Sequence, residues 1–190
     1  MTPVIGYHGE MPPMAFNMAR YCIGRAALAV PDKPALIVVS DPRAEPAEIW
    51  TYQRLERAIL HVAGALSQSR LTPGARILIR LDNTSDYALM FFGAVAAGFV
   101  PIPASTQLTD AEVSFLLENS GAEAMCVADH LASGQVPAGV RVIQQAEARR
   151  MIAQGPPGTY AATTANQPAY LIYTSGTTSR PKGGLPANRA

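Results

Sequence analysis

A short stretch near the end of this 190-residue chain concentrates residues that suit phosphate binding. It reads Tyr173-Thr174-Ser175-Gly176-Thr177-Thr178-Ser179-Arg180-Pro181-Lys182-Gly183. Its five hydroxyl side chains and one lysine supply many short donors and a mobile positive charge. Together with backbone N–H groups, these are the donors that a bound triphosphate needs around it. The composition of the stretch therefore predicts a loop that binds nucleotide phosphates.

Two other interpretations of this stretch fit its context less well. A flexible linker of Ser, Thr and Gly is common, but such linkers rarely follow a buried strand at once or end in Pro-Lys-Gly. The stretch directly follows the apolar residues 169–173, which predict a buried strand. A Walker A loop fails on spacing, because Pro181 stands where its second glycine belongs and Gly183 where its Mg²⁺-binding hydroxyl belongs.

Apolar spacing along the chain alternates between the helical and the strand period. Helices are predicted within residues 19–30, 55–66, 85–98, 109–121 and 145–154. Strands are predicted at 35–39, 77–79, 124–127, 140–143 and 169–173, with 49–52 as a hairpin partner and 100–103 as extended chain. This order favours an α/β fold whose mostly parallel sheet is flanked by helices. Such sheets bind ligands at the loops that leave their strands, where the hydroxyl-rich loop is expected.

Four segments are predicted along the chain. Residues 1–16 form an irregular N-terminal segment, and 17–154 form the α/β subdomain. Residues 155–168, which begin with Gly-Pro-Pro-Gly, carry no core-forming pattern and are predicted to be a linker. Residues 169–190 hold the last strand and the phosphate-binding loop, so the chain ends within a domain.

Composition excludes several classes of partner. The net charge is +1, from 15 basic and 14 acidic residues, so no overall field would draw the chain to nucleic acid or anionic lipid. Charged residues make up only 15%, against roughly 25% in a typical soluble domain. Two explanations of this low charge content fit equally well. Much of the surface of the chain could be covered in the functional protein, or the chain could have an Ala-rich α/β core. The uncharged run 87–100 is too short to span a bilayer and stops at Pro101, so it predicts a buried core helix and no transmembrane segment.

The other residues that could bind a metal or take part in catalysis are not arranged in a pattern that supports such a role. Cys22 and Cys126 have no ligand-like spacing and are predicted to be buried hydrophobes in a reducing cytoplasm, and the N-terminus does not resemble a secretory signal. The three histidines are scattered, so no metal site is predicted. Asp82 and Asp86 are interpreted as helix caps, and Arg149-Arg150 as a solvated helix face. No catalytic residue is predicted within the chain.

Almost letter for letter, the loop resembles the phosphate-binding loop of the adenylate-forming enzymes, an aromatic residue followed by Thr-Ser-Gly-Thr-Thr-Gly-x-Pro-Lys-Gly. That superfamily includes acyl- and aryl-CoA synthetases, luciferases and the adenylation domains of peptide synthetases. Upstream, Trp50-Thr51-Tyr52-Gln53-Arg54-Leu55 resembles the family's Thr-Tyr-x-x-Leu element. Ala97-Gly98-Phe99-Val100-Pro101-Ile102-Pro103 resembles its Gly-x-Val-x-x-Pro element. The overall spacing is most similar to that of the acyl- and aryl-CoA ligases.

The resemblance implies a fold, a reaction and a set of binding residues. The fold would be the N-terminal part of the large domain of an acyl-CoA synthetase. The reaction would join a carboxylic acid to ATP as an acyl-adenylate, with release of pyrophosphate, and then transfer the acyl group to coenzyme A. Mg²⁺ would share the phosphate charge. The cofactor-binding residues would be Thr174, Ser175, Gly176, Thr177, Thr178, Ser179 and Lys182.

The sequence departs from the family pattern in three respects. Ser179 replaces the second loop glycine, which costs about 1–2 kcal/mol if that position needs a positive φ. Gly184 and Pro186 occupy places where the family usually has a valine and, shortly after, a histidine. The family's later motifs, including its C-terminal lysine, have no counterpart. We therefore expect an N-terminal portion of an acid–CoA ligase that is inactive by itself. The alternative is a truncated or degenerate non-catalytic module that binds nucleotides or a protein partner.

Overall fold

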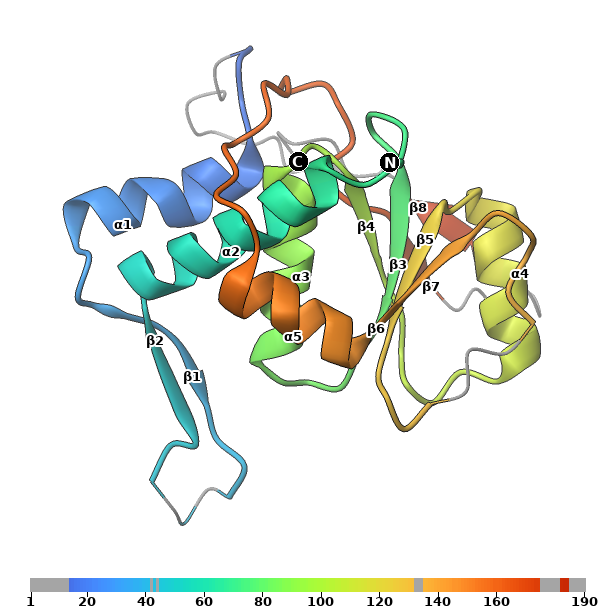
Figure 1. Cartoon of the computed structure of the whole chain (residues 1–190), viewed down its shortest axis with the longest axis horizontal. Helices are drawn as coiled ribbons and strands as arrows, with labels where there is room; N and C mark the ends of the chain where they lie inside the picture. The colour runs from blue at the N-terminus through green and yellow to red at the C-terminus, as the bar shows by residue number, and fades with distance from the viewer. Residues whose placement is uncertain (1–13, 42, 44, 132–134, 175–181, 185–190) are drawn as a thin grey trace, which may run out of the picture.

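The computed structural model describes residues 14–41, 43, 45–131, 135–174 and 182–184. It confirms the predicted α/β architecture, in which helices cover both faces of a four-stranded parallel sheet (Figure 1). In chain order the elements are η1 (Arg20–Gly24), α1 (Arg25–Ala29), β1 (Pro34–Val38), β2 (Glu48–Thr51), α2 (Tyr52–Ser67), β3 (Arg76–Arg80), α3 (Ser85–Ala96), β4 (Val100–Pro103), α4 (Asp110–Ser120), β5 (Ala124–Val127), β6 (Arg141–Gln144), α5 (Gln145–Gln154), β7 (Ile172–Thr174) and β8 (Lys182–Gly184).

The central sheet has the strand order β4-β3-β5-β6, and all neighbouring strands are parallel. Successive side chains of a strand point to opposite faces. Ile77 and Ile79 pack with α2, α3 and α5, whereas Leu78 packs with α4 on the other face. The two central strands, β3 and β5, are buried on both sides, which explains why they read as nearly continuous apolar runs.

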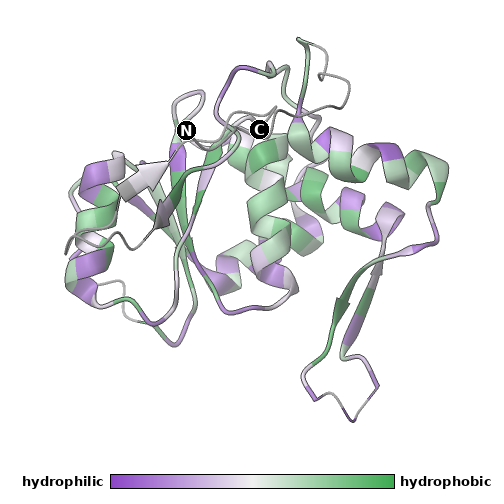
Figure 2. Cartoon of the chain, turned by 180° about the vertical axis from the view of Figure 1, so that it is seen from behind, coloured by the Kyte–Doolittle hydropathy of each residue, from purple (hydrophilic) through white to green (hydrophobic). Residues whose placement is uncertain are grey.

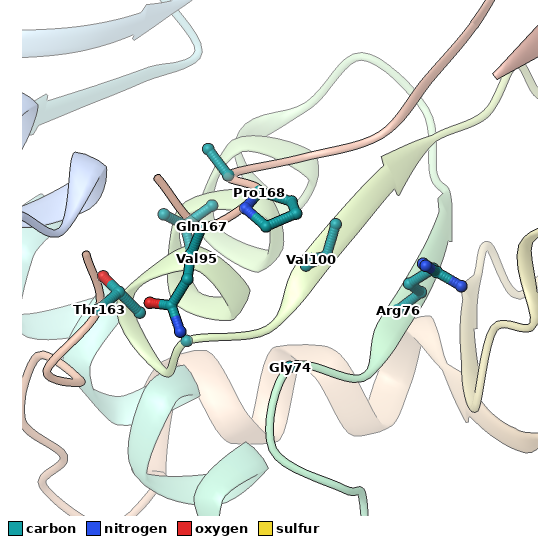
Figure 3. Close-up of a pocket in the computed structure, with 9 residues that line it drawn as sticks. Gly74, Arg76, Val95, Val100, Thr163, Gln167 and Pro168 are labelled. Atoms are coloured by element: carbon teal, nitrogen blue, oxygen red, sulfur yellow. The ribbon is translucent and has the colours of Figure 1, made fainter. Parts of the chain in front are cut away.

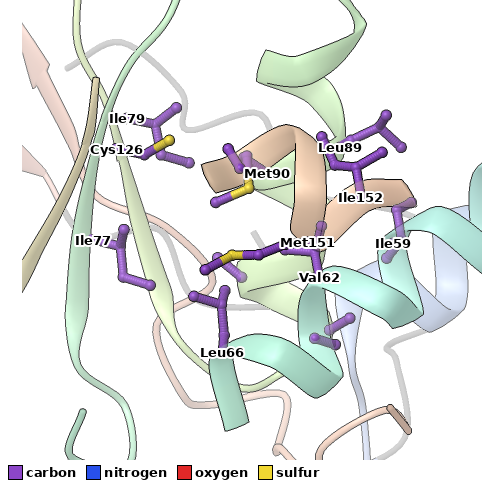
Figure 4. Packing of buried hydrophobic residues seen from close by; sticks show 14 of the residues in the cluster. Ile59, Val62, Leu66, Ile77, Ile79, Leu89, Met90, Cys126, Met151 and Ile152 are labelled. Atoms are coloured by element: carbon purple, nitrogen blue, oxygen red, sulfur yellow. The ribbon is translucent and has the colours of Figure 1, made fainter. Parts of the chain in front are cut away.

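The larger hydrophobic cluster lies where the helices α2, α3 and α5 pack against the sheet (Figure 4). Its side chains come from all three helices and from β3 and β5, and include Ile59, Val62, Leu66, Ile77, Ile79, Leu89, Met90, Cys126, Met151 and Ile152. Helices α2 and α3 approach closely at Gly93, where an added Cβ would lie 2.4 Å from Cγ1 of Val62. This glycine therefore sets the distance between the two helices.

Helix α3 accounts for most of the uncharged run at 87–100. Leu89, Met90 and Ala94 are fully buried in it, as expected for a core helix. Within the described ranges, no helix has both the length and the apolar character needed to cross a membrane.

Helix α4 begins and ends where the sequence predicts. Thr109 and Glu112 form a complete capping box, in which each side chain accepts a hydrogen bond from the other residue's backbone N–H group. Gly121 ends the helix in the left-handed conformation with φ 62°. Both signals depend only on residues a few positions apart, so local sequence is enough to specify them.

The carboxylates interpreted as caps of α3 serve other contacts. The N-cap residue is Thr84, without a side-chain cap hydrogen bond. Asp86, in the first turn, accepts hydrogen bonds from Nε2 of Gln145 at 2.8 Å and Nε of Arg149 at 2.7 Å, both on α5. The Asp82 carboxylate lies 3.6 Å from Nδ1 of His130. The cap interpretation is therefore corrected, because these groups connect neighbouring elements.

Strands β1 and β2 form the predicted hairpin, which extends away from the helices (Figure 2). Ile37 and Ile49 pair across it, and each is about half exposed. Tyr52, predicted as the end of the second strand, instead begins α2, because the Thr51 side chain accepts from the Arg54 N–H group and caps the helix.

Residues 155–168 lie against α2 and α3, although their sequence has no core-forming period. The Gly158 N–H group donates to the Leu60 carbonyl at 3.0 Å, and the Ala161 N–H group donates to the Ala96 carbonyl at 2.7 Å. Ala165 is only 2% exposed. These contacts are largely between backbones, so apolar spacing does not reveal them.

The two cysteines have different environments, which leads to a labelling prediction. Cys22 is exposed, contrary to expectation, whereas Cys126 is buried, and burial is the main cause that raises its pKa to about 12. Because the thiolate is the reactive form, we expect a disulfide reagent at pH 8 to modify only Cys22 in the native protein and both thiols after unfolding. Cys22→Ser should abolish the native signal. Rapid native labelling of Cys126 would contradict this packing.

Candidate phosphate-binding site

The predicted loop is carried by an antiparallel hairpin of β7 and β8. Thr174 pairs with Lys182, and Tyr173 pairs with Gly183. The two ends of the loop are therefore neighbours, and the chain returns on β8 beside the point where it left β7. Of the predicted binding residues, the hairpin includes Thr174 and Lys182. The others lie outside the described residues, namely Ser175, Gly176, Thr177, Thr178 and Ser179.

Strand β7 differs from the predicted strand 169–173 in extent and in pairing. It covers Ile172–Thr174, and among the described residues it pairs with β8 rather than with the parallel sheet. The preceding residues do reach that sheet. The Leu171 N–H group donates to the Pro101 carbonyl of β4 at 3.0 Å, and the Leu171 side chain is 5% exposed. The hairpin is thus attached at the edge of the sheet without extending it.

The composition of β4 explains why the sheet stops there. The N–H groups of Val100 and Ala104 donate toward β3, so residues 101 and 103 face the outer edge. Both are prolines, which have no N–H group. The edge offers carbonyl acceptors but no donors at these positions, and prolines are typical of such edge strands.

Tyr173 and Gly183 fit closely at the base of the loop. The Tyr173 hydroxyl donates to Oδ1 of Asn119 at 2.8 Å, and burial raises the pKa of this tyrosine. A Cβ added at Gly183 would lie 3.2 Å from Cζ of Tyr173 and 3.2 Å from Cδ1 of Leu171. A glycine at this position therefore lets β8 lie directly against the aromatic residue that precedes the loop.

Arg80 was not singled out from the sequence, yet it is a buried charged residue of the sheet. It ends β3, is 4% exposed, and donates to the carbonyls of Thr106 at 3.3 Å and Leu108 at 2.5 Å. The signal that could have identified it is an arginine that directly continues the apolar run 77–79. It fixes the loop after β4. In the described part of the chain, no three metal-ligating side chains converge.

A small cavity of about 130 Å³ lies at the amino-terminal edge of β3 and β4 (Figure 3). Thr163 and Gln167 lie on one side of it and Arg76 on the other. Nη1 of Arg76 already donates to the Ser120 carbonyl at 2.5 Å, and Oε1 of Gln167 accepts from the Thr164 N–H group at 2.7 Å.

Comparison with known proteins agrees with the features of the loop and the sheet. A family model described as "AMP-binding enzyme" matches residues 23–185. The 4-hydroxybenzoate–CoA/benzoate–CoA ligase of Rhodopseudomonas palustris is 32% identical over 157 residues, which cover 73% of this chain and 28% of the relative. The fatty acid–[acyl-carrier-protein] ligase ScoC of Streptomyces coeruleorubidus is 30% identical over 154 residues, with 74% and 28% covered.

A solved structure supports the fold. The N-terminal subdomain of Klebsiella oxytoca NpsA, in complex with 3-hydroxybenzoyl-AMSN, superposes with a TM-score of 0.76 at 20% identity. The match covers 93% of this chain and 41% of that one. The chain thus spans little more than a quarter of the length of the two ligases, 28% of each.

Proposed function

The chain belongs to the family of AMP-binding enzymes, and from this premise we propose that it supplies the phosphate-binding loop of an acid–CoA ligase. In the first step of that reaction, a carboxylate oxygen of the acid attacks the α-phosphorus of ATP. The bond from this phosphorus to the bridging oxygen breaks, and pyrophosphate leaves. In the second step, the thiol sulfur of coenzyme A attacks the acyl carbon and AMP leaves.

The observation that carries the proposal is the hairpin pairing of Thr174 with Lys182. It brings a hydroxyl residue and the one lysine of the stretch to adjacent backbone positions at the mouth of a loop rich in donors. The first step needs charge neutralisation on the leaving pyrophosphate more than covalent help. The hydroxyls and N–H groups of the loop would hold the β- and γ-phosphates, and Lys182 would be the cation at its end. Mg²⁺, when bound, would share the neutralisation of the phosphate charge.

Coenzyme A as the acceptor rests on similarity to a CoA ligase and on the spacing of the upstream elements. The relative named as a 4-hydroxybenzoate–CoA/benzoate–CoA ligase is 32% identical to this chain. ScoC, named as an acyl-carrier-protein ligase, is 30% identical and favours a carrier-protein thiol as the second candidate. Both acceptors present a thiol to the same acyl-adenylate, so the loop would have the same role in either case.

A lysine-labelling experiment tests the loop, because the chain contains only Lys33 and Lys182. We expect Mg·ATP to protect Lys182 from acylation by an N-hydroxysuccinimide ester and to leave Lys33 unaffected, as measured by peptide mass spectrometry. Lys182→Ala should weaken Mg·ATP binding in calorimetry by about tenfold or more, since a charge-assisted contact is lost. Lys33→Ala is the matched control and should bind as the parent does. Equal protection of both lysines would overturn the assignment.

Catalysis is tested separately by ATP–pyrophosphate exchange with a panel of aromatic and aliphatic carboxylates. We expect no exchange by these 190 residues alone, because the family motifs for adenine, ribose and the C-terminal lysine have no counterpart in the sequence. Exchange by the protein purified from its source, followed by AMP release on addition of coenzyme A, would support the ligase. Release only with a carrier protein favours the second candidate, and ATP binding without any exchange favours a non-catalytic module.

A further inference from the structure

A second concave surface lies between α2 and α5, on residues that the loop does not use. It is a groove of about 250 Å³, floored by Trp50, Ala58 and Ile152. Its basic rim consists of Arg54, Arg57 and His61, spaced so that they share one face of α2. We propose that this groove binds a small organic anion, with a phosphate or carboxylate head at the arginines and a compact apolar body on the floor.

The two rim arginines form no ion pair with neighbouring carboxylates among the described residues. None of the described residues that line the groove is acidic. Oε2 of Glu48 accepts hydrogen bonds from Nε1 of Trp50 at 2.7 Å and from the Ser85 hydroxyl at 2.8 Å. Glu56 accepts from the Tyr160 hydroxyl at 2.9 Å. The ion pairs found among the described residues involve neither Arg54 nor Arg57.

Arg54 is held in position before any ligand arrives. Its guanidinium carbon lies 3.9 Å from the centre of the Trp50 ring, and Nη1 donates to the Ile49 carbonyl at 3.0 Å. A guanidinium carries five donors, so others are left for an oxyanion. A planar fork that is already oriented loses little freedom on binding, and it suits the two oxygens of a carboxylate or phosphate.

The helix that carries the rim adds to its positive potential. Arg54 lies in the first turn of α2, where the helix dipole is positive, and this turn contains no acidic residue. Nδ1 of His61 lies 3.3 Å from the Ile152 carbonyl near the C-terminal end of α5. The imidazole therefore already has a hydrogen-bond partner on that helix. The two arginines remain as the charges that an anion would neutralise.

The apolar floor and the volume define the body of the ligand. Trp50 is 8% exposed and Ile152 8%, so both are packed in the core and present only limited surface. A volume of 250 Å³ equals about eight waters at roughly 30 Å³ each, which suits a single small ring or a short aliphatic group. Inorganic phosphate would use the rim alone, whereas phenyl phosphate would use rim and floor.

Trp50 is the single tryptophan of the chain, and its fluorescence therefore reports on this groove. We expect phenyl phosphate to change its emission saturably and to bind more tightly than inorganic phosphate, while phenol has no effect. Benzoate tests the carboxylate head. Arg57→Ala should weaken phenyl phosphate binding about tenfold or more, because a charge-assisted contact is lost. Arg70→Ala, an exposed arginine outside the groove, is the matched control.

Two further measurements separate binding in this groove from binding at the phosphate loop and from a purely structural role of Arg57. Lys182→Ala should leave phenyl phosphate binding unchanged, because Lys182 lies on β8, whereas the residues that line the groove belong to β2, α2 and α5. Thermal unfolding of Arg57→Ala should match the parent, because the described structure gives Arg57 no hydrogen bond or ion pair. An equal affinity for Arg57→Ala and Arg70→Ala, or no saturable response to phenyl phosphate or benzoate, would overturn the proposal. A lowered thermal stability of Arg57→Ala without any loss of affinity would assign the arginine to the helix alone and also overturn it.

Discussion

Gly64→Ala is expected to lower the free energy of unfolding by about 3 kcal/mol or more, although alanine is the better helix former. A Cβ at position 64 would lie 2.0 Å from the Pro156 carbonyl oxygen and 2.9 Å from the Gly158 nitrogen. Backbone atoms cannot rotate aside as a flexible side chain can. The segment that begins at Gly155 would therefore separate from α2, and the hydrogen bond from Gly158 to Leu60 would be lost.

Urea denaturation followed by circular dichroism and by Trp50 fluorescence measures this effect. Ser67→Ala, an exposed substitution at the end of the same helix, is the control and should change stability by no more than about 0.5 kcal/mol. Helix propensity alone would make Gly64→Ala about 1 kcal/mol more stable, so propensity and backbone overlap predict changes of opposite sign. An unchanged or increased midpoint would show that α2 does not contact residues 155–158 as described.

Asn17→Ala should lower the free energy of unfolding by about 2–4 kcal/mol, through the loss of a buried polar hub. Asn17 is 7% exposed, and its Nδ2 group donates to the carbonyls of Val95 at 3.1 Å, Ala96 at 3.2 Å and Ala161 at 3.2 Å. The first two carbonyls belong to the last turn of α3. Each of the three carbonyls also accepts one backbone N–H group, so without the amide each would lose its second, buried hydrogen bond.

The same side chain also caps the helical segment that leads into η1. Its Oδ1 accepts from the N–H groups of Ala19 at 3.1 Å and Arg20 at 3.3 Å. Asn17→Asp keeps this acceptor but directs a second acceptor at the three carbonyls, so it should also be destabilising. Asn119→Ala, which removes one exposed hydrogen bond, should cost about 1 kcal/mol or less. If Asn17→Asp unfolds like the parent protein, only the cap matters and the hub does not.

Prediction from sequence succeeded where a few neighbouring residues settle the outcome. The strand at Ala124–Val127 and the helix at Gln145–Gln154 were predicted with these bounds, and the capping box of α4 with its Gly121 end was read from single motifs. The family also followed from the sequence, because the loop motif is a continuous string of residues.

Prediction failed where two distant segments must meet. The placing of β7 depends on which hydrogen-bonding groups the edge of β4 leaves unused. Cys22 proved exposed, because burial of one side of a helix depends on which distant segment packs against it. Asp86 was interpreted by its position at a helix start, whereas its partners lie on α5. A carboxylate has the same local pattern whether it caps a helix or binds a remote side chain.

The sequence by itself therefore determined the order of the strands and helices before β8, the parallel α/β class and the phosphate-loop motif, since periodicity, caps and motifs are local properties. The tertiary structure decided that residues 155–168 lie against α2 and α3 and that the loop stands on its own hairpin beside β4. It also decided that Arg54 and Arg57, which form no ion pair among the described residues, border a groove against α5. The physical reason is that close backbone approach and the balance of charge are set by pairs of segments far apart in the chain, and no local pattern records them.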